Sequence, residues 1–234
     1  MRVTIGLGGS VFVTEDLDVE FLQEAAGVFR GLLSQGHEIL VVVGGGKTSR
    51  KYIKAARELG ASDRDCDEIG INITRLNAKL LIEALGDVAE QKPVETFEGA
   101  IRVMLKGKIP VMGGTFPGQT TDAVAAGLAN FSMSELLIFF VDVGGIYTSD
   151  PKLSPEARKL ETIGASELVK MAQDIRMKPG VTAVVDPIAA KLIQRARLRT
   201  LVLGREELGR LPAIIKGGGH SGTTILPGDP NSRT

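Results

Sequence analysis

Short apolar segments alternate with longer amphipathic segments along most of the chain. Arg2–Leu7 and His37–Val43 carry runs of apolar residues that are typical of buried strands. Between them, Val19–Ser34 has apolar residues at helical spacing, which predicts a helix with one buried face. By the same criteria, further strands are predicted at Lys108–Met112, Glu135–Val141 and Thr200–Leu203. Further helices are predicted at Thr48–Leu59, Asp67–Leu85, Thr121–Phe131, Ala165–Ala172 and Asp186–Ala196, with a turn at Lys178-Pro179-Gly180 and a closing segment at Ile214–Ile225.

This alternation predicts an α/β fold, in which an open, mostly parallel sheet is sandwiched by helices on both faces. The character of the sequence changes near residue 150, where Asp150-Pro151 and Ser154-Pro155 mark a loop. We therefore predict one domain over residues 1–234 with two closely packed lobes, about 1–135 and about 136–234.

Glycine-rich segments follow four of the predicted strands. They are Gly8-Gly9-Ser10, Gly44-Gly45-Gly46, Gly113-Gly114-Thr115 and Asp142-Val143-Gly144-Gly145. In sheets of this kind, ligands bind beyond the carboxyl ends of the strands. Four such segments at one edge predict a backbone surface that a polyanionic ligand approaches closely.

The overall composition argues against several classes of function. Lysine plus arginine equals aspartate plus glutamate, at 28 residues each, so the basic surface of a nucleic-acid-binding protein is not expected. The most apolar run, Leu136–Val141, is far below the roughly 20 residues that span a bilayer, and the N-terminus lacks the apolar region of a signal peptide. The one cysteine, Cys66, cannot form an internal disulfide. We therefore expect a soluble, cytoplasmic protein with neither nucleic-acid nor membrane partners.

The segment Gly44-Gly45-Gly46-Lys47-Thr48 ends like a Walker A phosphate loop but does not begin like one. That motif needs a glycine at the position where Val41 stands. What remains is a triple-glycine turn with Lys47 and Arg50 about one helical turn apart. Basic side chains there oppose the helix dipole unless an anion binds, so the segment is suited to cradle phosphate. The alternative is an ordinary turn with solvated basic residues.

The segment from Gly113 to Asp122 joins a predicted strand to a predicted helix. It contains three glycines, three threonines and a proline, and its hydroxyls and amides suit an oxyanion and a planar polar ring. Asp122 falls in the first turn of the helix, where a carboxylate can orient nearby lysines or a nucleotide-bound Mg²⁺. The alternative for Asp122 is helix capping alone.

The segment from Asp142 to Lys152 follows the next buried strand. Tyr147 is suited to pack on a base, and Lys152 is suited to reach a phosphate. Asp142 and Asp150 can accept hydrogen bonds from ribose or base. Taken singly, each of these residues also has an ordinary structural explanation in a turn or at the surface.

Together these motifs occur in an order and spacing that resemble the amino-acid kinase superfamily, and within it the uridylate kinase branch of archaeal type. The resemblance covers nearly the whole chain, and its specific part is Gly113-Gly114-Thr115-x-Pro117-Gly118-x-Thr120-Thr121-Asp122. The other matching motifs are Gly8-Gly9-Ser10, Gly44-Gly45-Gly46-Lys47-x-x-Arg50, Gly145-Ile146-Tyr147-Thr148-x-Asp150-Pro151, Asp186-Pro187-x-Ala189-Ala190 and Lys216-Gly217.

The resemblance implies a kinase that transfers phosphate from ATP to UMP, with Mg²⁺ arriving on ATP and the chain assembled as a homohexamer. The N-terminal lobe would bind the acceptor and the C-terminal lobe the nucleotide. Catalysis would involve Lys47, Arg50 and Asp122. ATP would contact Gly9, Ser10, Gly46, Arg50, Val141, Asp142, Tyr147, Asp150 and Lys152. UMP would contact Gly45, Asp67, Gly114, Thr115, Phe116, Pro117, Gly118, Gln119 and Thr120.

The sequence departs from the family pattern at four positions. Gly6 stands where many superfamily members have lysine, a difference that archaeal-type uridylate kinases tend to share. Val141, Gly144 and Phe116 replace the usual threonine, aspartate and histidine. Two alternatives remain open: a kinase for another small acceptor, such as a carboxylate or an isoprenoid phosphate, and a non-catalytic nucleotide-binding or nucleotide-sensing oligomer.

Overall fold

The computed structural model describes residues 1–13, 16–176 and 184–228. These residues form a seven-stranded sheet in the order β3-β2-β1-β4-β6-β7-β5. The strands are β1 (Arg2–Leu7), β2 (Glu38–Val43), β3 (Val111–Met112), β4 (Leu136–Phe140), β5 (Thr162–Gly164), β6 (Thr200–Leu203) and β7 (Thr223–Leu226). The helices are α1 (Val19–Ser34), α2 (Gly46–Glu58), α3 (Asp63–Leu85), α4 (Phe97–Met104), α5 (Thr121–Phe131), α6 (Ala165–Arg176), α7 (Pro187–Ala196) and α8 (Leu211–Ile215), with 3-10 turns η1 (Gly9–Val11), η2 (Gly86–Val88) and η3 (Arg205–Arg210).

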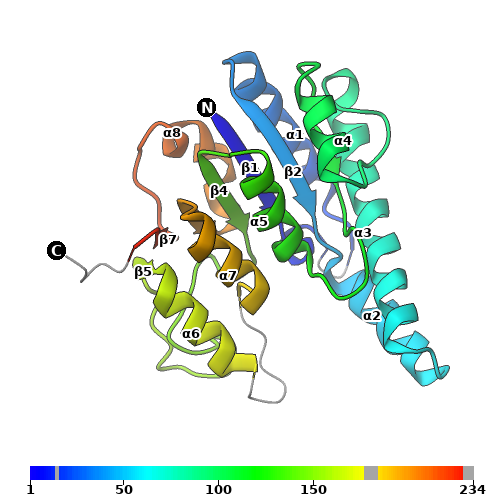
Figure 1. Ribbon diagram of the computed structural model, residues 1–234, viewed down its shortest axis with the longest axis vertical. Coiled ribbons are helices and arrows are strands. Elements are labelled where there is room, and N and C mark those ends of the chain that lie inside the picture. The colour runs from blue at the N-terminus through cyan, green and yellow to red at the C-terminus, as the bar shows by residue number, and fades with distance from the viewer. Residues whose placement is uncertain (14–15, 177–183, 229–234) are drawn as a thin grey trace.

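Helices cover both faces of the sheet (Figure 1). Successive side chains of a strand point to opposite faces. Ile5 and Ile138 belong to the core cluster that includes residues of α1, α3 and α8, while Leu137 and Phe139 belong to the cluster that includes residues of α4, α5, α6 and α7. All strand pairs are parallel except β6 with β7, which is antiparallel. The predicted α/β fold with a mostly parallel sheet is therefore confirmed.

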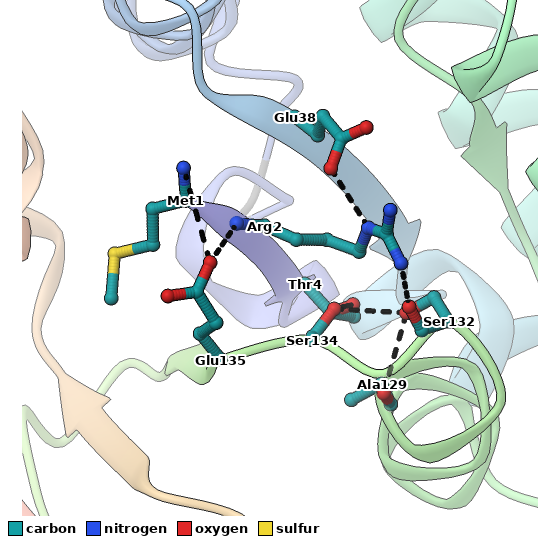
Figure 2. Close-up of polar contacts among 8 residues, drawn as sticks. All are labelled: Met1, Arg2, Thr4, Glu38, Ala129, Ser132, Ser134 and Glu135. Carbon is teal, nitrogen blue, oxygen red and sulfur yellow. Dashed lines mark hydrogen bonds and ion pairs between the residues drawn. The ribbon is translucent and has the colours of Figure 1, made fainter.

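Polar contacts at the amino-terminal edge of the sheet help to fix the register of the central strands (Figure 2). The guanidinium of Arg2 in β1 bonds the Glu38 carboxylate at 2.9 Å, and these two residues are direct partners across the β1–β2 ladder. The backbone amide of Arg2 donates to the Glu135 carboxylate just before β4, and the guanidinium also contacts the carbonyl of Ser132. These contacts hold β1 to both of its neighbours at the end of the sheet opposite the glycine-rich segments.

Most predicted elements occur, and four of them have the predicted bounds: β1, α1, α5 and β6. The strand predicted at Lys108–Met112 is shortened to β3, because Pro110 has no amide to contribute to a ladder. The closing segment forms α8 and β7 with a loop between them. The predictions omitted α4 and β5. The predicted turn at Lys178-Pro179-Gly180 lies outside the described residues.

Candidate functional site

The carboxyl ends of four neighbouring parallel strands line one cleft. The strands β3, β2, β1 and β4 are adjacent in that order, and each leads into one of the glycine-rich segments. The cleft has a volume of about 660 Å³. The prediction that these four segments share one edge of the sheet is confirmed.

The loops after β1 and β2 touch through backbone that leaves no room for side chains. A Cβ on Gly9 would lie 2.6 Å from the carbonyl carbon of Gly45 and closer still to the nitrogen of Gly46. Gly46 has φ +62°, and a Cβ there would lie 2.6 Å from the carbonyl oxygen of Gly9. Glycine at these positions therefore lets two backbone segments approach each other at the start of α2, which borders the cleft.

The two basic residues of the predicted phosphate cradle, Lys47 and Arg50, differ in their position relative to the cleft. Arg50 lines the cleft, and both terminal nitrogens of its guanidinium lie 3.4 Å from the Ser10 hydroxyl oxygen. Lys47 is exposed on the first turn of α2 and is absent from the described lining of the cleft. The fold therefore brings Arg50, Ser10, Gly9 and Gly46 together and leaves Lys47 at their periphery.

One face of α3 supports the loops after β2 and β3. Asn77 donates from its side-chain amide to the Gly44 carbonyl at 2.8 Å, and the Thr74 hydroxyl accepts from the Gly114 amide at 2.7 Å. Asp67 accepts from the Gly118 amide at 2.8 Å. Because these side chains are spaced three and seven residues apart, they lie along one side of the helix. Sequence reasoning missed Thr74 and Asn77, although polar residues on this stripe of the predicted helix were a visible signal.

The loop from Gly114 to Thr120 only partly faces the cleft. Gly114, Gln119 and Thr120 line it, together with Gly45 and Asp67. The four middle residues of the loop, including Phe116 with 56% of its surface exposed, lie outside the described lining. The lining thus contains only part of the predicted UMP set, and Thr115, Phe116, Pro117 and Gly118 stand apart from it.

Two helix N-termini are joined beside the cleft. The Thr120 hydroxyl oxygen caps α5 by accepting from the Ala123 amide at 3.1 Å, and the same hydroxyl donates to the Asp186 carboxylate. Asp186 in turn caps α7 by accepting from the Ile188 amide at 2.7 Å. Asp122 lines the cleft in the first turn of α5. Because Thr120 is the cap of that helix, capping is not the role of Asp122.

The carboxyl of Asp122 lies in surroundings that favour its neutral form. Burial raises its pKa to about 7, and the nearby Asp186 carboxylate adds to the shift. Desolvation and a like charge both penalise the ionised form. Such a group in a cleft is typical of a functional residue.

The segment after β4 contributes a polar edge and an apolar wall. Val141, Asp142, Tyr147, Asp150 and Lys152 all line the cleft, and the ammonium of Lys152 pairs with the Asp142 carboxylate. The apolar wall comes mainly from α6 and the residues before α7, which sequence reasoning did not assign to the site. Its members are Leu168, Met171, Ala172, Val184 and Val185.

No protein-held metal centre is found in the described part of the chain, where no group of three or more histidine, cysteine, aspartate or glutamate side chains could hold an ion. Among the described residues, no helix is both long and apolar enough to cross a membrane.

Known proteins similar to this chain agree on one family. A model of the amino acid kinase family matches residues 1–204. A protein named uridylate kinase from Thermococcus gammatolerans is 47% identical over 227 residues, which cover 97% of this chain and 100% of that protein. Another, from Methanocaldococcus jannaschii, is 48% identical over 204 residues, which cover 87% and 90% of the two chains.

Solved structures agree with the sequence relatives. The crystal structure of uridylate kinase from Archaeoglobus fulgidus matches with a TM-score of 0.84 and 40% identity, over 97% of this chain and 100% of that one. The structure of UMP kinase from Bacillus anthracis matches with a TM-score of 0.79 at 24% identity, over 97% and 96% of the two chains, and at that identity it supports the fold alone.

Proposed function

The chain belongs to the amino acid kinase family, and on this premise we propose that it is a UMP kinase, which transfers the γ-phosphoryl group of Mg-ATP to UMP and yields ADP and UDP. The observation that carries the proposal is a single cleft shared by the glycine loops of β1 and β2, the loop after β3 and the half-buried carboxyl of Asp122. The relatives named uridylate kinase, which align over nearly the whole chain, support UMP as the acceptor.

The cleft is divided between the two substrates in this proposal. Gly9, Ser10, Gly46 and Arg50 bind the ATP phosphates, because backbone amides at a helix N-terminus and a guanidinium both favour anions. The apolar wall from α6 packs against the base of ATP, and the edge from Val141 to Lys152 contacts its ribose and phosphates. UMP binds between Asp67 and the loop from Gly114 to Thr120, with Gly45 between the two sites.

The chemistry needs positioning and neutralisation of charge more than it needs a base. An oxygen of the UMP phosphate is already ionised near neutral pH, so it attacks the γ-phosphorus without losing a proton. A new P–O bond forms to UMP as the bond to the bridging oxygen of ADP breaks. Arg50, assisted by Lys47 at the edge of the cleft, stabilises the charge on the transferred group.

Magnesium enters as part of the Mg-ATP substrate. The described residues offer the carboxylates of Asp122 and Asp186 near the cleft and no closed set of protein ligands, which suits an ion held largely by phosphate oxygens. Bound Mg²⁺ supplies additional neutralisation of phosphate charge. Asp122 organises the transfer centre from the first turn of α5.

The proposal also covers the pathway, the cellular compartment and the assembly of the enzyme. A UMP kinase acts in pyrimidine nucleotide biosynthesis, and we expect this one to work in the cytoplasm as a homohexamer. The acceptor-binding lobe spans about residues 1–135 and the nucleotide-binding lobe about 136–234.

A coupled assay of ADP release tests the proposed reaction. Purified protein with Mg-ATP is offered UMP, CMP, GMP, AMP, glutamate and isopentenyl phosphate in parallel. Turnover with UMP, and little with the other acceptors, is the expected result. Turnover with glutamate or isopentenyl phosphate instead would make the chain a kinase for another acceptor. Binding of ATP or UMP without any turnover would indicate a nucleotide-binding protein.

A further inference from the structure

The side chain of Arg75 makes three contacts that converge on the loop after β3. Its Nε donates to the Gly114 carbonyl, and one terminal nitrogen donates to the Thr115 carbonyl, each at 3.3 Å. The other terminal nitrogen pairs with the Glu95 carboxylate at 2.9 Å. Only 26% of the Arg75 side chain is exposed, so the guanidinium is held between α3, this loop and the segment before α4.

These contacts constrain the direction of the loop amides. The peptide bonds are trans, so the carbonyl of one residue and the N–H of the next point in opposite directions. The carbonyls of Gly114 and Thr115 point at Arg75, and the N–H groups of Thr115 and Phe116 therefore point away from it. Within the described residues, neither N–H has a recorded hydrogen-bond acceptor.

We propose that Arg75 is a positioning residue for the acceptor: it holds the loop after β3 by the Gly114 and Thr115 carbonyls, so that the loop residues lining the cleft stay in place for UMP. This inference rests on the proposed UMP kinase function. Thr74 accepts from the Gly114 amide from the same helix, so both ends of that residue are held by α3. The loop residues that line the cleft, Gly114, Gln119 and Thr120, then keep a fixed relation to Asp67.

The geometry calls for arginine rather than any cation. A planar guanidinium can donate to two carbonyls and a carboxylate at once, whereas a lysine ammonium is a single point charge on a flexible stem. Arg75→Lys therefore keeps the charge and the pairing with Glu95 but loses hydrogen bonds to the carbonyls of the loop. This separates a positioning role from a simple ion pair.

Steady-state kinetics of wild type, Arg75→Ala and Arg75→Lys test the inference. We expect KM for UMP to rise about tenfold in Arg75→Ala, equivalent to about 1.4 kcal/mol. The lysine variant should show a smaller rise in the same parameter. KM for ATP and kcat should stay within about threefold, because the lost contact orders the acceptor site. Arg64→Ala, which removes an arginine of α3 paired with Glu68 and 80% exposed, is the matched control and should change neither KM.

The outcomes separate the two proposals. An unchanged KM for UMP in folded Arg75→Ala, or equal rises in KM for both substrates, would overturn the positioning role. If Arg75→Ala does not fold, the lysine variant decides, and a lysine variant with wild-type KM for UMP would also overturn it. Wild-type protein without turnover of UMP would instead remove the proposed function, and the inference with it.

Discussion

At the scale of the residue, Asp122 carries a carboxyl that is destabilised in its charged form. Burial, with a contribution from Asp186, raises its pKa from 3.8 to about 7. Between these values the folded protein keeps a proton that the unfolded chain has released, so the free energy of unfolding falls as pH rises through this window. Above about pH 7 this carboxyl is ionised in both the folded and the unfolded state, and the full cost of its charge in the folded protein lowers the free energy of unfolding.

Asp122→Asn removes this penalty and is expected to stabilise the protein. Each pKa unit corresponds to about 1.4 kcal/mol, and solvent in the cleft reduces the total, so we expect about 2 kcal/mol at pH 8. The two proteins should have equal stability near pH 4. Urea unfolding in metal-free buffer at both pH values measures the difference. An asparagine variant that is no more stable than wild type at pH 8 would contradict the assigned environment.

The same substitution should lower turnover by about 100-fold or more, because a neutral amide cannot supply the charge that organises phosphoryl transfer. Gain of stability with loss of activity is the pattern of a residue kept for function. Wild-type turnover in the folded variant would remove Asp122 from the catalytic assignments.

The sequence predicted those site residues that belong to motifs and missed those that do not. Arg50, Asp67 and Asp122 belong to a pattern of residue types along the chain, and all three line the cleft. Arg75 and Asn77 act on loops that lie 39 or 40 and 32 or 33 residues away in the sequence. Helical periodicity places each side chain on its own side of α3, but it does not tell which loop that side meets.

At the scale of the element, the contact between the loops after β1 and β2 permits no side chain. The Cβ of Gly9→Ala would overlap backbone atoms of Gly45 and Gly46, which cannot swing aside as a side chain does. We expect Gly9→Ala to lower the free energy of unfolding by about 2 kcal/mol or more and to raise KM for ATP about tenfold or more through displaced phosphate-binding amides.

A matched control lies on α1. An added Cβ at Gly27 meets nothing within 4 Å, and the residue is exposed in mid-helix. Gly27→Ala should therefore stabilise the protein by about 0.5–1 kcal/mol and leave KM for ATP unchanged. Thermal unfolding and ATP kinetics compare the two variants, and similar behaviour of both would show that the loop contact is not a constraint.

Elements with a strong pattern of their own were predictable, and those that depend on distant partners were not. The helix α3 begins four residues before its predicted start, at Asp63, because Ser62 and Asp65 form a reciprocal capping box. That signal was present in the sequence and was overlooked. The strand β5 has three residues and is recognisable only through its pairing with β7. No local periodicity identifies a strand so short.

At the scale of the whole molecule, the two predicted lobes share one sheet. The ladder between β1 and β4 runs from Val3–Leu136 to Leu7–Phe140 and crosses the predicted boundary near residue 135. Strand order was not predictable from periodicity, since each apolar strand fits equally well beside any other. The position of the cleft could be predicted without that order, because all the parallel strands end at the same edge.

A hydrogen bond between Thr120 and Asp186 also connects the lobes, close to Asp122. Thr120→Val removes the hydroxyl that both caps α5 and holds Asp186, whereas Thr120→Ser keeps it. Loss of the cap should lower stability by about 1 kcal/mol. If the bond between α5 and α7 also aligns the acceptor lobe with the nucleotide lobe, kcat should fall about tenfold in the valine variant and recover in the serine variant. Comparison of kcat and urea unfolding for the three proteins separates the two effects, and a valine variant that is less stable yet fully active would limit this bond to a capping role.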